Sequence, residues 1–204
     1  MKKIIITITI LLLSIIVLGG NVCAQENDMG KTLIVYYSLT GNTKTGCEVL
    51  QKELMSDVLE IRDLVNRSGG WGFARSAFGS LFGLHTKIDP EQPDMSAYQN
   101  IIIASPIWTG KLSMAIRTFI DKNRFDNKKV ILYTTTNAEE KEKYKEKNRN
   151  LLREKGGEVV GYFQILAKKE IDEEKVMRTK EEMTAETLSL VSSLKEMFLT
   201  NGSK

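Results

Sequence analysis

The chain has 204 residues, enough for one α/β domain with a sizeable hydrophobic core. It contains 29 basic and 26 acidic side chains, for a formal net charge of +3. Residues 1–24 hold two lysines and no acid, so without them the chain would carry 27 basic and 26 acidic side chains, a net charge of +1. This near balance excludes an electrostatic basis for nucleic-acid binding, and we expect no nucleic-acid partner.

Residues 1–24 are typical of a secretory signal peptide. Lys2 and Lys3 precede an uncharged run over residues 4–18, and small residues before Gln25 fit a cleavage site. The run is shorter than the ~20 apolar residues of a membrane span. We therefore expect export to the periplasm or the extracellular space. An uncleaved anchor, giving membrane association through the N-terminus, is the alternative.

A further interpretation of the N-terminal residues is a lipoprotein signal with a diacylated Cys23. The residue before a lipidated cysteine is normally very small, and Val22 is not. Cleavage after residue 24 would leave Cys47 as the only cysteine, so the mature domain would form no internal disulfide. Cys47 falls on the apolar side of an expected helix, where a buried small hydrophobe is the plain interpretation.

Residues 25–30 form a short polar linker, and residues 31–200 alternate between strand and helix patterns. A β-loop-α-β opening is the unit that builds parallel sheets. The sequence predicts a three-layer α/β/α domain with a doubly wound, five-stranded parallel sheet. Its strands are expected over residues 31–37, 57–61, 101–104, 130–133 and 158–167, and its main helices over 43–54, 112–120, 139–155 and 173–199.

Residues 66–85 are less regular, with aromatic residues at helical spacing interrupted by glycines. A short amphipathic helix covering one sheet face is the plain interpretation. The alternative is a flap near a ligand site with Trp71 as its wall. His85, the only histidine, is expected on the surface, because it precedes an apparent exposed connection containing Pro90 and Pro93.

Polar loops follow the first, third and fourth expected strands. Hydroxyl groups and backbone N–H groups at a helix N-terminus suit a phosphate group, and the first loop supplies both. The second loop combines a fixed proline, a broad aromatic surface and a glycine. The candidate ligand-binding residues are Ser38, Leu39, Thr40, Gly41, Asn42 and Thr43 in the first loop, Pro106, Ile107, Trp108, Thr109, Gly110 and Lys111 in the second, and Thr135, Thr136 and Asn137 in the third.

The segment S-L-T-G-N-T at 38–43 resembles the phosphate loop of flavodoxins. The segment S-P-I-W-T-G at 105–110 resembles the flavin-contacting loop of flavodoxin-like proteins. The resemblance covers residues 31–200, and it implies strand order 2-1-3-4-5 with FMN at the switch between the first and third strands. The first loop would hold the phosphate of FMN, and the second would hold its ring.

The third loop departs from the family pattern, because residues 134–140 contain neither a glycine nor an aromatic residue. Tyr144 and Trp71 are the candidates for covering the open ring face. Lys111 has two readings: a cation that raises the flavin potential, or an exposed residue near the start of the helix.

The resemblance implies an FMN-binding redox protein that carries electrons to or from a partner protein. The first alternative is an NAD(P)H-dependent reductase acting on a small-molecule quinone or flavin. The second is a non-redox binding module that has lost FMN. No side-chain acid or base is required for the flavin chemistry, and we expect no catalytic residue and no metal site.

Overall fold

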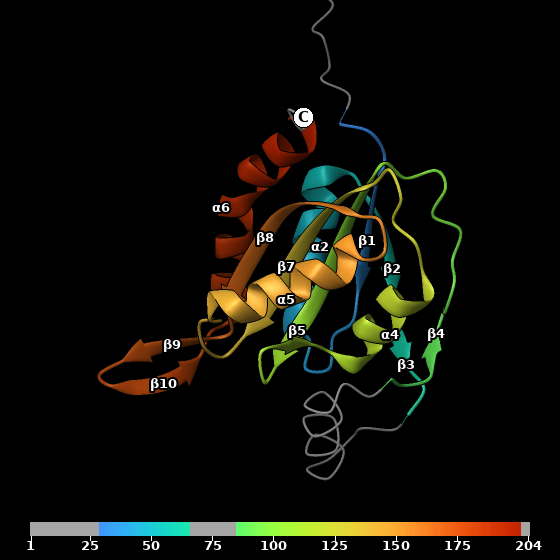
Figure 1. The fold of residues 1–204 in the computed structure, drawn as a ribbon. Helices are drawn as coiled ribbons and strands as arrows, with labels where there is room; N and C mark the ends of the chain where they lie inside the picture. Colours follow the sequence, from blue (N-terminus) through green and yellow to red (C-terminus); the bar gives the residue numbers. More distant parts are fainter. Residues whose placement is uncertain (1–28, 66–84, 201–204) are drawn as a thin grey trace, which may run out of the picture.

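The computed structural model describes residues 29–65 and 85–200. In this part of the chain, long strands alternate with helices (Figure 1). The strands are β1 (Thr32–Tyr36), β2 (Asp57–Glu60), β3 (Arg62–Asp63), β4 (Ile88–Asp89), β5 (Asn100–Trp108), β6 (Lys111–Leu112), β7 (Lys129–Thr136), β8 (Glu158–Leu166), β9 (Lys168–Ile171) and β10 (Glu174–Met177). The helices are α2 (Asn42–Leu54), α4 (Met114–Lys122), α5 (Glu142–Arg153) and α6 (Lys180–Leu199).

Five parallel strands form the central sheet in the order β2-β1-β5-β7-β8. Counted along the chain these are strands 2-1-3-4-5, so the predicted fold class and strand order are confirmed. Val35 lies opposite Ile103, and Ile103 opposite Leu132, in the centre of the sheet. All three side chains are completely or almost completely buried, because central parallel strands are covered on both faces.

Helices cover the sheet on both sides and give the three layers. Leu50 of α2 and Leu194 of α6 pack in one core, against β1, β5 and β7. Phe119 of α4 and Leu152 of α5 pack in the other core, on the opposite face. In Figure 1, α4 and α5 accordingly lie in front of the sheet, and α2 and α6 lie behind it.

Two strands are longer than the sequence predicted. β5 continues from Ala104 through Ser105–Trp108, where a loop was expected, and β7 continues through Thr134–Thr136. The sequence predicts loops at these strand ends because they contain hydroxyl and proline residues. In the structure, Ile107, Thr134 and Thr135 are buried and extend the sheet. The candidate loops are therefore shorter and lie closer to the sheet than expected.

The predicted helix over 173–199 begins too early. Its first part forms β10, which pairs with β9 in an antiparallel hairpin, and α6 begins at Lys180 after the N-cap Thr179. Thr179 and Glu182 make a capping box, a local signal for this start that the sequence does contain. The helical pattern over 173–199 predicts Val176 and Leu188 on the buried side of this helix. Both predictions are wrong, because Val176 belongs to β10 and Leu188 is 46% exposed.

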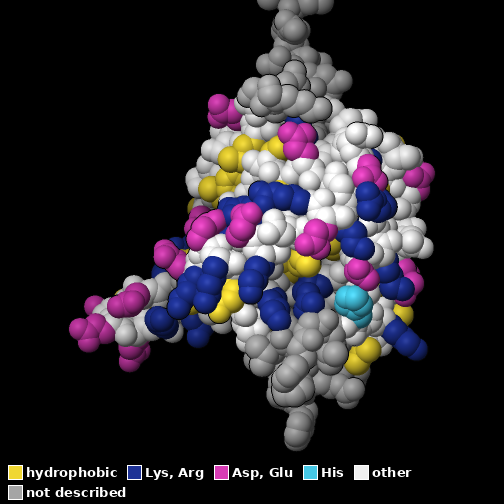
Figure 2. Space-filling model, viewed as in Figure 1, with side chains coloured by type: hydrophobic (Ala, Val, Ile, Leu, Met, Phe, Trp, Pro, Cys, Tyr) yellow, Lys and Arg dark blue, Asp and Glu magenta, His cyan; other side chains and the backbone are white. Residues whose placement is uncertain are grey.

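The hairpin β9–β10 projects from the domain beyond the end of β8 (Figure 1). Figure 2 shows acidic side chains at its tip and basic side chains toward its root. The tip residues Asp172 and Glu173 both have positive φ, as in the two-residue turns that fit the twist of a hairpin. A strongly charged sequence thus forms strands here despite a composition that favours a helix.

Two single-residue predictions are confirmed. Cys47 is buried, and the His85 side chain is 53% exposed, with its Nδ1 3.9 Å from a carboxylate oxygen of Asp121. The segment 66–84, including Trp71, and the signal-peptide prediction for residues 1–24 lie outside the described residues. Among the helices that the structure describes, none has the length and apolar character needed to cross a bilayer.

Candidate functional site

The carboxyl ends of β1, β5 and β7 place the three candidate segments along one edge of the sheet. β5 lies between the other two strands, with Tyr36 opposite Ala104 and Ala104 opposite Tyr133. The backbone N–H of Tyr37 extends this pairing with a 3.2 Å hydrogen bond to the Ala104 carbonyl. In open α/β sheets, ligands bind at this edge, where the direction of strand progression reverses.

The first segment leads into α2. The N-cap residue of this helix is a glycine, so it offers no side-chain hydrogen bond to the N–H groups of the first turn. Gly41 is the N-cap of α2, with φ 93°, and a Cβ built on it would meet nothing within 4 Å. The hydroxyl of Ser38 accepts a 3.2 Å hydrogen bond from the Lys44 N–H. The N–H groups of Asn42 and Thr43, at the first two helical positions, have no carbonyl four residues back within the helix. This geometry favours an anion in the open space beside Gly41.

Thr43 and Thr135 connect the first and third segments in the interior. Their hydroxyl oxygens are 2.7 Å apart, and both residues are buried. The Thr43 hydroxyl, a candidate ligand contact, lies within hydrogen-bonding distance of β7, and either hydroxyl of the pair can be the donor. The hydroxyl pair ties the start of α2 to the end of β7.

The second segment is the end of a strand followed by a tight hairpin. Trp108 pairs with Lys111 across the turn, and both Thr109 and Gly110 have positive φ, of 51° and 77°. Two such residues in a two-residue loop are the signature of a type I′ turn. The Trp108 ring meets the Tyr37 ring edge to face, with centroids 6.1 Å apart. The residue that precedes the first segment is therefore in direct contact with the second segment.

Tyr144 of α5 packs against the turn. A Cβ added to Gly110 would lie 2.7 Å from Cγ of the Tyr144 ring, a distance that side chains do not tolerate. Gly110 is thus required both for its positive φ and for this close approach. Tyr144 was a candidate for covering a ligand ring, and the structure places it against the backbone of the second segment.

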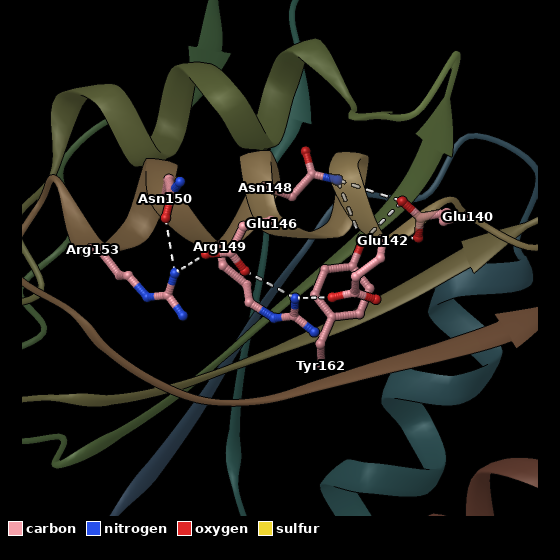
Figure 3. Close-up of polar contacts among 8 residues, drawn as sticks. All are labelled: Glu140, Glu142, Glu146, Asn148, Arg149, Asn150, Arg153 and Tyr162. Atoms are coloured by element: carbon pink, nitrogen blue, oxygen red, sulfur yellow. Dashed lines mark hydrogen bonds and ion pairs between the residues drawn. The ribbon is translucent and has the colours of Figure 1, made fainter.

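A polar cluster lies next to the turn, formed by Glu140, Asn148 and Tyr162 (Figure 3). The Tyr162 hydroxyl donates to the Glu140 carboxylate, with oxygen–oxygen distances of 2.8 and 3.0 Å. Burial raises the pKa of Glu140, and the hydrogen bonds from Tyr162 and Thr134 oppose that rise. Burial and the Glu140 charge raise the pKa of Tyr162, so its phenol stays protonated at neutral pH.

The raised pKa of Glu140 predicts a pH dependence of stability. The folded protein binds this proton more tightly than the unfolded chain, so the resulting stabilisation is complete below the unfolded pKa. It is lost as the pH rises from there through the folded pKa. In chemical denaturation between pH 4 and 8, we expect the wild type to lose stability relative to Glu140→Gln over this window. Parallel pH profiles for the two proteins would contradict this assignment.

A comparison with protein families matches residues 76–184, just over half of the chain, to the family described as flavodoxin domain. The chain belongs to this family. No curated protein matches the chain. The solved structures do show similar folds, and their sequence identities are low enough that they bear on the fold alone.

Three flavoproteins illustrate the structural likeness. A flavoprotein from Lactobacillus acidophilus NCFM, solved in complex with FMN, is 24% identical over 66% of this chain and 93% of its own, with TM-score 0.55. A putative flavoprotein from Bacteroides uniformis is 21% identical over 76% and 96%, with TM-score 0.60. One from Bacteroides eggerthii is 18% identical over 80% and 98%, with TM-score 0.58.

The flavodoxin domain brings the predicted site residues to one edge but does not expose all of them. Ile107 is buried, and Leu39 packs against the same core, so these two side chains support the segments from within. Thr40, Thr109 and Asn137 are exposed. Ser38, Gly41, Asn42, Pro106, Trp108, Gly110, Lys111 and Thr136 are partly buried.

Four further residues of the flavodoxin domain lie next to the candidate site and were not predicted from the sequence: Tyr37, Glu140, Asn148 and Tyr162. The position of Asn148 in the sequence does indicate that its side chain faces the core. Asn148 lies four residues after Tyr144 and four before Leu152, on the one apolar stripe of an otherwise charged helix. Glu140 and Tyr162 had no such local signal, because their contact joins residues 22 positions apart.

Proposed function

We propose that this flavodoxin domain binds FMN non-covalently and acts as a redox protein. The observation that carries the proposal is the contact between Tyr37 and Trp108. It places the strand end that leads into the helix N-terminus of α2, which is suited to an anion, against a segment that presents a large aromatic surface. FMN has a phosphate at one end and a flat ring at the other, and these two features match it. The FMN named with the Lactobacillus acidophilus flavoprotein supports the same assignment.

The residues of the first segment fit the phosphate. Gly41 leaves open space beside the start of α2, where the helix dipole and the N–H groups of Asn42 and Thr43 favour negative charge. The exposed Thr40 and the partly buried Ser38 add hydroxyl groups. No basic side chain is required, because backbone donors at a helix N-terminus bind phosphate by themselves.

The residues of the second and third segments fit the ring. Trp108 supplies an aromatic surface, and the backbone of Thr109 and Gly110 supplies polar groups in a rigid turn. Bound FMN would supply the electron-accepting and electron-donating chemistry, while the protein orients the ring and sets its electrostatic environment. Lys111 is a candidate for raising the flavin potential through its charge.

A titration with two flavins tests the proposal. We expect the purified domain to quench FMN fluorescence with at least about a hundredfold higher affinity than riboflavin, because only FMN carries the phosphate. The holoprotein should also show a visible flavin absorption spectrum. A colourless protein that quenches neither flavin would contradict FMN binding and favour a binding module without cofactor.

The same holoprotein separates an electron carrier from a reductase. Rapid bleaching of the flavin by NADPH in stopped-flow would identify a reductase acting on quinones or flavins. Without bleaching, a carrier that exchanges electrons with a partner protein is the function we favour. We further propose that the protein acts outside the cytoplasm, and N-terminal sequencing of the exported protein should then begin at Gln25.

A further inference from the structure

Asn148 is a buried amide in the middle of α5, only 2% exposed. Its Nδ2 atom lies 3.4 Å from the Gly110 carbonyl oxygen, 3.5 Å from Oε2 of Glu140 and 3.4 Å from the Tyr162 hydroxyl. A buried amide is costly unless it is hydrogen-bonded. These contacts are long, so each is of modest strength, and together they connect Glu140 to the turn of the second segment.

The charge of Glu140 determines which end of the Asn148 amide faces the turn. An ionised carboxylate only accepts hydrogen bonds, and so does the Gly110 carbonyl. Both therefore require the NH₂ group of Asn148. Its two hydrogens are shared among three acceptors, because the Tyr162 hydroxyl, which donates to Glu140, also lies 3.4 Å from Nδ2. A protonated Glu140 could instead donate to the oxygen of Asn148, which would allow the amide to rotate and release Gly110.

The groups that the structure describes around Glu140 are those expected of a residue that positions its neighbours, and they do not form a stabilising ion pair with it. Among the residues that the structure describes, no lysine or arginine is paired with it. Its hydrogen-bonding partners are the neutral Tyr162, Thr134 and Asn148. The charged groups around the cluster are Glu142, Lys145 and Arg149 of α5, and Arg149 lies over the Tyr162 ring while pairing with Glu142 and Glu146. A partly buried carboxylate without a paired cation costs stability.

We propose that Glu140 and Asn148 are positioning residues that fix the Gly110 carbonyl and thereby the backbone groups that the Thr109–Gly110 turn presents to the flavin. Gly110 needs such a restraint, because a glycine at φ 77° has wide conformational freedom. Tyr144 limits the space of this residue, and Asn148 fixes its direction. The flavin part of this inference rests on the proposed function, whereas the restraint itself belongs to the protein alone.

The restraint is tested first without flavin, by NMR of the apoprotein between pH 4 and 8. In the wild type, the Gly110 carbonyl carbon and the following amide should shift with the same midpoint as the Glu140 carboxyl carbon. Glu140→Gln should abolish this titration, and Asn148→Leu should uncouple the turn from Glu140. Glu142→Gln is the matched control, because Glu142 is exposed, lies two residues away and should leave the Gly110 titration intact.

FMN affinity gives the second measurement. Loss of one such hydrogen bond should weaken FMN binding about fivefold in Glu140→Gln and in Asn148→Leu. The double variant should be no weaker than either single one, because both act through the same carbonyl. As the pH falls and Glu140 becomes protonated, the FMN affinity of the wild type should fall relative to that of Glu140→Gln. The FMN phosphate titrates equally with both proteins, so the ratio of the two affinities reports on Glu140 alone.

The outcomes separate the two proposals. If FMN does not bind the wild type, the proposed function fails, and the NMR titration alone decides the restraint. If Gly110 signals are unchanged in a folded Glu140→Gln protein, the positioning role is overturned even when FMN binds. Should Asn148→Leu fail to fold, Glu140→Gln still decides, because it keeps the shape and volume of the side chain.

Discussion

Replacing Gly46 by alanine is expected to destabilise the domain by about 3 kcal/mol. The same change in the middle of a helix normally stabilises by up to ~1 kcal/mol. Here the helix α2 packs tightly on the sheet: a Cβ on Gly46 would lie 1.9 Å from the hydroxyl oxygen and 2.5 Å from Cζ of Tyr133. Packing therefore outweighs helix propensity at this position.

Tyr133 has no space into which it can retreat. It is completely buried, and its hydroxyl lies 2.8 Å from Oγ1 of Thr187 in α6. The Thr187 hydroxyl donates to the Met183 carbonyl, so Tyr133 is the donor to Thr187. Movement of the ring would break this buried hydrogen bond, and movement of α2 would open the core. Overpacking costs ~1–3 kcal/mol and a lost buried hydrogen bond ~1–3 kcal/mol, which together exceed the gain in propensity.

Urea unfolding of Gly46→Ala measures this cost, and Tyr133→Phe supplies the control. Removing the hydroxyl takes away the nearest atom but leaves the ring, so the double variant should recover only part of the loss. The two changes should deviate from additivity by about 1 kcal/mol, since the residues are in contact. Unchanged stability in Gly46→Ala would show that α2 does not approach the sheet this closely.

The buried strands were predictable because their residues carry a local signal. The run at 101–104 is entirely apolar, and such a run is typical of a central parallel strand. The ends of β5 and β7 were not predictable in the same way. Thr134 and Thr135 carry hydroxyl groups that also suit a loop. They lie in the strand because both pair with β8, and the Thr135 hydroxyl is within hydrogen-bonding distance of Thr43.

The site shows the same division between local and long-range information. The segment 38–43 combines a strand end, a glycine and a helix start within a few residues, so its place could be predicted. The contact of Tyr144 with Gly110 and that of Asn148 with Gly110 join residues more than thirty positions apart. Only the packing of α5 against the β5–β6 hairpin shows that residues of α5 restrain the Thr109–Gly110 turn.

Replacing Asn42 by aspartate is expected to weaken FMN binding about a hundredfold, or ~2.7 kcal/mol, while leaving riboflavin binding within about twofold. Asn42 is the first residue of α2, beside the open space at Gly41. The aspartate would repel the FMN phosphate at the point where the helix otherwise attracts it. The first turn contains no acidic residue in the wild type, so the change introduces a new charge.

Protein stability should move in the opposite direction to affinity. An acidic side chain in the first turn interacts favourably with the helix dipole, so Asn42→Asp should raise the free energy of unfolding by ~0.3–1 kcal/mol. A loss of FMN binding accompanied by a gain in stability cannot result from misfolding. Added salt should narrow the affinity difference between variant and wild type, because it screens the repulsion.

Asn127→Asp is the matched control for this charge. Asn127 is exposed and precedes β7, so it lies at the amino edge of the sheet, opposite the candidate site. The same substitution there changes the net charge equally and should leave FMN affinity within about twofold of the wild type. If Asn42→Asp and Asn127→Asp bind FMN equally well, the phosphate does not lie at the start of α2. If Asn42→Asp weakens FMN and riboflavin alike, the loop acts on the ring and not on the phosphate.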